Sequence, residues 1–234
     1  MNKLSSGNTY WTELTNSRLV TRVANAFENG TMAYLDASSV FDMDGHNQLL
    51  NVLHGLAGST VTSSRPATLT LLCSQNGNAQ DNILGGENRA NSAAFSGLVS
   101  VTKQGSFQHT LAATSSSTGT LKVTAGVLTL SGAWPNCTNV VVSGGTFAVK
   151  NANAFGDNLR ASGESPKVEV DVTSGASLVL DYTGRIDCAA FRLGGTKLYG
   201  TFGAPGSGAD NEYAWISGTG LMRVLPKGTT ILFR

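Results

Sequence analysis

Charge is scarce in this chain of 234 residues, and its scarcity excludes whole classes of partner. Only 13% of the residues are charged, whereas about 25% are charged in an average globular domain. The formal net charge is +1, and no cluster of Lys and Arg with interleaved aromatic residues occurs. Because such a balance gives no long-range attraction to a polyanion, we expect neither nucleic acid nor an anionic membrane surface as a partner.

Long apolar runs and paired cysteines are also missing. No stretch of about 18 apolar residues is present, which excludes a transmembrane helix, and the start of the chain lacks the apolar core of a signal peptide. The three cysteines contain no CxxC pair, so a zinc or thioredoxin-like site is not expected. They fall in or beside alternating segments, where we expect inert core residues: Cys73, Cys137 and Cys188.

Glycine and short alternating segments are what the chain does contain. Residues 119–132 (GTLKVTAGVLTLSG) and 139–158 (NVVVSGGTFAVKNANAFGDN) repeat one pattern, in which a glycine opens a short strand and a turn leads to the next glycine. An apolar period of two places one set of side chains on each face of a strand. Repeated strand–turn units of this size predict a solenoid of stacked coils.

The rest of the chain gives the expected organisation. Residues 1–30 are read as an irregular N-terminal segment or cap, in which Leu19, Val23 and Phe27 fit either a short capping helix or a strand and turn. Residues 31–225 are expected to form the β-solenoid, with a polar loop insertion near 74–92, and 226–234 to be a tail or last strand. The predicted fold is all-β, a right-handed parallel β-helix or β-solenoid.

One local motif suggests calcium. Asp42 and Asp44, followed by Gly45, resemble the beginning of an EF-hand loop. Position 12 of that loop, however, is Leu53, which cannot ligate. The alternative, and the favoured one, is a turn in which Asp, Gly and Asn supply the backbone geometry.

A polysaccharide-cleaving enzyme is the main alternative to a structural protein, because it needs two carboxylates on one groove. Glu169 and Asp171 share a strand face with Lys167, which is also the pattern of a solvated strand. A second group contains Asp181, Arg185 and Asp187. Neither group includes a histidine, because His46, His54 and His109 are scattered. We therefore assign no catalytic, cofactor-binding or metal-ligating residue; Asn29 and Asn136 lie in glycosylation sequons.

The units at 119–158 resemble the autotransporter-associated β-strand repeat of bacterial secreted passenger domains. A weaker copy precedes them at residues 101–123, and the similarity extends over about residues 35–225. The resemblance implies a right-handed parallel β-helix, export, and a role as a stalk or in surface display, without catalytic residues. The membrane barrel that ends autotransporters is not encoded, since only nine residues follow Leu225.

These expectations converge on a non-enzymatic structural or adhesive segment, a C-terminal fragment of a longer exported protein at the cell surface or outside the cell. Its partners would be host or cell-surface glycans or proteins. Two alternatives stay open: a carbohydrate-active β-helix enzyme (a polysaccharide lyase or glycosidase), and a phage tail-fibre-like shaft, which would require a trimer.

Overall fold

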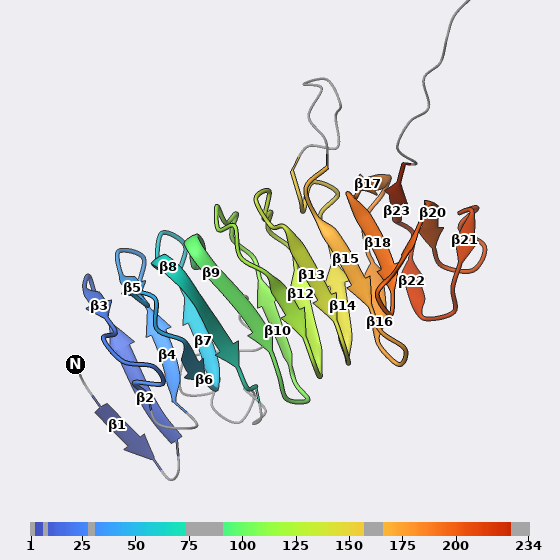
Figure 1. Ribbon diagram of the computed structural model, residues 1–234. Helices are drawn as coiled ribbons and strands as arrows, with labels where there is room; N and C mark the ends of the chain where they lie inside the picture. Colours follow the sequence, from blue (N-terminus) through green and yellow to red (C-terminus); the bar gives the residue numbers. More distant parts are fainter. Residues whose placement is uncertain (1–2, 7–8, 28–30, 74–90, 157–165, 226–234) are drawn as a thin grey trace, which may run out of the picture.

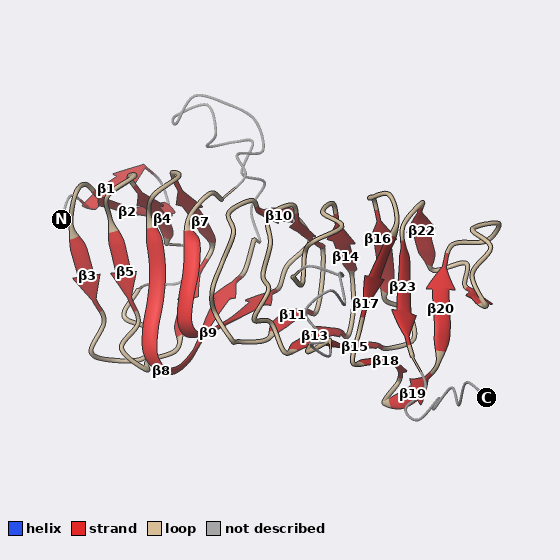
Figure 2. Cartoon of the chain, turned by 90° about the horizontal axis from the view of Figure 1, so that it is seen from above, coloured by secondary structure: helices blue, strands red, loops and turns tan. Residues whose placement is uncertain are grey.

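Short strands make up the whole of the regular structure. The computed structural model describes residues 3–6, 9–27, 31–73, 91–156 and 166–225, and in these ranges the fold is all-β, without a helix. The strands lie side by side along one axis from the N-terminal to the C-terminal end (Figure 1). Seen from above, they form walls on different sides of that axis (Figure 2).

The described strands belong to four sheets. The longest sheet has ten strands: β3 (Arg18–Val20), β5 (Val40–Asp42), β6 (Gln48–Leu50), β8 (Thr60–Leu71), β9 (Ala94–Lys103), β11 (Leu121–Val123), β13 (Asn139–Val142), β15 (Glu169–Val172), β18 (Ala190–Leu193) and β19 (Thr196–Leu198). A five-stranded sheet contains β10 (Gln108–Leu111), β12 (Val127–Leu130), β14 (Thr146–Val149), β16 (Ser177–Leu180) and β22 (Ile216–Gly218). Two four-stranded sheets complete the set: β1 (Lys3–Ser6), β2 (Thr9–Leu14), β4 (Met32–Leu35) and β7 (Val52–Gly55), and then β17 (Arg185–Asp187), β20 (Gly200–Gly203), β21 (Asn211–Glu212) and β23 (Leu221–Val224).

Most neighbouring strands pair in parallel, with partners about one repeat apart in the sequence. Leu121 lies opposite Val140, 19 residues later, and Val140 lies opposite Val170. Among the described strands, the antiparallel pairs are β1–β2, β18–β19 and β20–β23. Because parallel neighbours cannot be joined by a tight hairpin, each strand leads around a corner into another sheet before the chain returns.

The core consists of straight rows of inward-facing residues. The alternation within each strand and the register between strands align these residues, all of them fully buried, in one row of the ten-stranded sheet: Leu69, Val101, Leu121, Val140, Val170 and Phe191. Stacking such rows removes apolar surface from water at roughly 25 cal/mol per Å², so the period of two seen in the sequence is the source of the fold's stability.

Glycines occupy the corners where the ten-stranded sheet turns into the five-stranded sheet. Gly105, Gly126 and Gly145 occur at three successive corners, each with a φ between 64° and 72°. A Cβ on Gly145 would lie 2.4 Å from the Gly126 carbonyl oxygen, and one on Gly126 would lie 2.4 Å from that of Gly105. The corners therefore stack too closely for any side chain, which explains why a glycine precedes each strand of the repeat.

The N-terminal segment differs from the expectation of an irregular cap. Within residues 1–30 the structure places β1, β2 and β3, and β3 joins the ten-stranded sheet beside β5. The capping helix is wrong, because Leu19 lies opposite Phe41 in this pairing while Val23 is 60% exposed. The expected loop near 74–92 and the tail at 226–234 fall almost wholly outside the described residues.

Candidate functional site

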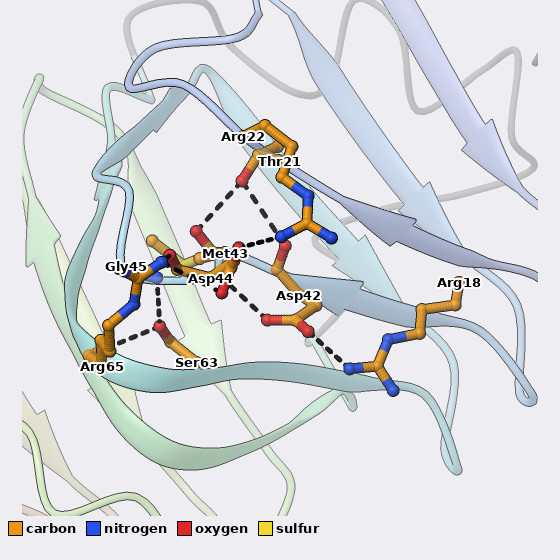
Figure 3. Close-up of polar contacts among 9 residues, drawn as sticks. All are labelled: Arg18, Thr21, Arg22, Asp42, Met43, Asp44, Gly45, Ser63 and Arg65. Carbon is orange, nitrogen blue, oxygen red and sulfur yellow. Dashed lines mark hydrogen bonds and ion pairs between the residues drawn. The ribbon is translucent and has the colours of Figure 1, made fainter.

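The Asp42–Asn47 segment forms a turn at the end of β5 and is surrounded by arginines (Figure 3). Arg18 pairs with Asp42, and both Arg22 and Arg65 pair with Asp44, the latter at 3.2 Å. Leu53, the residue at position 12 of the hypothetical calcium loop, is fully buried. The carboxylates thus bind guanidinium groups, and the turn interpretation accounts for their placement better than a calcium loop.

This ion-pair network joins three successive segments of the ten-stranded sheet. Asp44 has a φ of 45°, and Gly45 donates its backbone N–H to Ser63 on β8. Partial burial acts to raise the pKa of Asp44, but the hydrogen bond from Arg65 and the charges of Arg22 and Arg65 outweigh it and lower the pKa below its ordinary value. Since the arginine side chains are more than 60% exposed, each pair contributes about 0–1 kcal/mol.

Glu169 and Asp171 lie on the outward face of β15, as the alternation predicted. The neighbouring strand β18 brings Arg192 to Glu169, with 3.1 Å between Nη2 and Oε2. Asp171 accepts a hydrogen bond from the backbone N–H of Gly195. Lys167 is exposed just before the strand. Two carboxylates and an arginine are therefore adjacent on this face, and both carboxylates have protein partners.

The group of Asp181, Arg185 and Asp187 is divided between two pairings. Asp181 faces Lys150 at 3.5 Å, and both side chains are at least half exposed. The Asp187 side chain is only 7% exposed and forms a two-pronged pair with Arg223 on β23, at 2.7 and 2.8 Å. The structure thus does not unite the group; the strong pair is with an arginine 36 residues away that the sequence reading had not singled out.

Lys103 is the functional-looking residue that the sequence reading missed. It occupies an inward position of β9 opposite Leu71 and Val123 and is fully buried. Its ammonium group donates to three corner carbonyls, those of Gln104 at 2.6 Å, Gly105 at 3.0 Å and Ala125 at 3.3 Å. Burial lowers the pKa of Lys103, and the three carbonyls compensate the buried charge. The run Val99, Val101, Lys103 was the available signal, because it places a lysine on the apolar face.

All three cysteines are free thiols buried in the core, as expected. Burial raises the pKa of Cys73 to about 11 and those of Cys137 and Cys188 to about 12. Because the thiolate is the reactive form, these thiols are chemically inert in the folded protein. Of the two sequons, Asn29 lies outside the described residues, and the Asn136 side chain donates to the Ser116 carbonyl.

Comparison with known proteins adds no relative. No family model matches the chain, and neither the curated proteins nor the solved structures contain a match. In the ranges that the structure describes, no helix is long and apolar enough to cross a membrane. The argument about function therefore rests on the strand register and on the placement of the charged side chains.

Proposed function

We propose that the chain is a right-handed parallel β-helix that serves as a non-enzymatic structural or adhesive segment of an exported bacterial surface protein. One coil of this helix is one circuit of the chain through the sheets, about 19–20 residues long in the central part. The observation that carries the proposal is the constant register there: Val123 lies opposite Val142, and Leu130 lies opposite Val149, in both cases 19 residues apart. A constant step on two walls is what a stack of coils produces.

The surface chemistry supports the same proposal. Singled-out carboxylates such as Asp44 and Glu169 bind arginines of neighbouring strands, so these charges serve the stack. The outward positions in the centre are polar and mostly uncharged; Thr68, Ser100 and Thr120 form one such row. Hydroxyl-rich surfaces of this kind suit contact with glycans or proteins at a cell surface, which are the partners we propose.

A polysaccharide-cleaving enzyme remains the second candidate because of one observation, the adjacency of Glu169, Asp171 and Arg192. Both carboxylates sit on one strand face, as an acid–base pair would. Against catalysis, Glu169 is engaged by Arg192 and Asp171 by a backbone amide.

The decisive experiment compares cleavage and binding. Purified protein is incubated with a panel of soluble polysaccharides and assayed for new reducing ends and unsaturated uronates, while protein-coated beads are tested on the same glycans and on cells. The proposal predicts bead adhesion without cleavage. The matched control is the variant with Glu169→Gln and Asp171→Asn; cleavage that this variant abolishes would establish the enzyme instead. A trimeric mass in solution would favour the tail-fibre alternative.

A further inference from the structure

The wall opposite the ten-stranded sheet has a weak joint between β7 and β10. One four-stranded sheet ends at β7, the five-stranded sheet begins at β10, and the described residues contribute only an isolated bridge from Asn91 between them. Ser92 donates to the Gly55 carbonyl at 2.8 Å, Asn91 donates to Thr110 at 2.9 Å, and Ala112 donates to Asn91 at 2.9 Å. We call this set of contacts the Asn91 joint.

The joint is tightly packed and contains buried imidazoles. A Cβ on Gly55 would lie 2.4 Å from that of Ala93 and 2.9 Å from Asn91 Oδ1. His54, the neighbour of Gly55 on β7, is 9% exposed and stacks on Tyr34 with 5.4 Å between ring centroids. On the β10 side, His109 is 5% exposed.

His109 is the one polar member of an otherwise apolar row. The register of the five-stranded sheet aligns it with four buried residues: Leu128, Phe147, Leu178 and Ile216. The Nε2 atom of His109 and the Nδ2 atom of Asn91 are buried without a hydrogen-bond partner among the described residues. An unsatisfied buried polar atom costs about 1–3 kcal/mol, so the joint is held less firmly than the sheets on either side.

The charges around His109 are of one sign. Lys103 on β9 and His54 on β7 are the groups whose charges act on it, and together with burial, the largest effect, they lower the pKa of His109 to about 4. The sequence contains no Asp or Glu from residue 91 to residue 149. Accepting a proton in place would thus create a second buried cation near the ammonium of Lys103.

We propose that the Asn91 joint is an acid-operated hinge: protonation of His109 expels its ring from the apolar row and separates β10 from Asn91. Opening lets the imidazolium reach water, so each drop in pH below the ordinary pKa of histidine favours the open form over the closed form. The sheets beyond β12 stay intact, because they carry no comparable group. Acid would then uncouple the N-terminal part of the stack from the rest.

Hydrogen exchange measured at single amides tests the hinge. With a histidine pKa of about 6.5 in the open form and about 4 in the closed form, linkage predicts that protection at the joint falls about 50-fold between pH 7 and pH 4.5. The reporters are the amides of Asn91, Ser92 and Ala112, and the reference amides are those of Ser143 and Lys150. Protection factors, which correct for intrinsic exchange, should fall at the joint and hold at the reference positions.

Two variants separate the hinge from general acid sensitivity. His109→Leu matches the apolar row and should abolish the acid-dependent loss of protection, whereas His46→Asn, which changes a histidine in a turn, should leave it unchanged. Equal loss in wild type and His109→Leu would overturn the proposal. If His109→Leu does not fold, NMR titration of His109 in the wild-type protein decides the question: a pKa close to 6.5 would overturn the proposal, and one near 4 would support it.

Discussion

The stacked corner glycines give a prediction that isolates one physical effect. Gly145 and Gly175 occupy equivalent corners, between β13 and β14 and between β15 and β16, and both have a positive φ, 67° and 86°. They differ in their surroundings. A Cβ on Gly145 would lie 2.4 Å from the Gly126 carbonyl oxygen, whereas a Cβ on Gly175 would meet nothing within 4 Å.

Replacing either glycine by alanine imposes the same conformational strain, about 1–2 kcal/mol, which reduced entropy of the unfolded chain offsets by about 0.4–1 kcal/mol. Gly145→Ala must in addition push two corners apart by about 1 Å to reach ordinary contact, and overpacking of this kind costs about 1–3 kcal/mol. We therefore expect Gly145→Ala to be destabilised by about 1–3 kcal/mol more than Gly175→Ala.

Thermal unfolding followed by circular dichroism measures this difference. For a chain of this length 1 kcal/mol shifts Tm by roughly 2–4 °C, so the two variants should differ by several degrees, with Gly175→Ala close to wild type. Equal Tm values for the two variants would refute the reasoning, because strain in φ alone would then account for the glycines and the close stacking of the corners would be immaterial.

Two further predictions concern the core. Asp187→Asn leaves the Arg223 guanidinium without its buried carboxylate and should lower the free energy of unfolding in urea by about 3 kcal/mol, whereas Lys150→Gln, which breaks an exposed pair, should change it by less than about 1 kcal/mol; similar losses for both would contradict the assigned burial. Because burial holds the thiol pKa values of Cys137 and Cys188 at about 12, neither should react with a disulfide reagent at pH 8 until the protein is unfolded. A stoichiometric reaction of the native protein would show that these residues are exposed.

The central repeat could be predicted from the sequence because its determinants are local. Alternation in residues 119–158 fixed which side chains face inward, and the glycines before each strand marked the corners. The placement of Asp42 and Asp44 in a turn was also local, since Asp and Gly favour such geometry. What these segments share is that neighbouring residues alone decide their conformation.

The remaining features depend on contacts between segments that are distant in the sequence. Lys103 lies on the apolar face of its strand, but the Ala125 carbonyl that helps to hold it comes from the next coil. The partner of Asp187 is 36 residues away. Strand β8 runs through Arg65 and Pro66 because an irregularity between Ser63 and Ala67 absorbs the extra residues. One sequence without its register cannot reveal such pairings.

Deleting one coil is the most direct test of the central claim, that the chain is a stack of equivalent coils with no indispensable chemical centre. Removing residues 124–142 joins Val123 to Ser143 in the register that Val142 normally occupies, whereas removing residues 124–133 deletes half a coil and breaks the register. Circular dichroism should show a β spectrum and a cooperative, less stable unfolding transition for the 19-residue deletion, and none for the shorter one. If the 19-residue deletion is as unfolded as the half-coil deletion, the coils are not equivalent and the proposed stack is wrong.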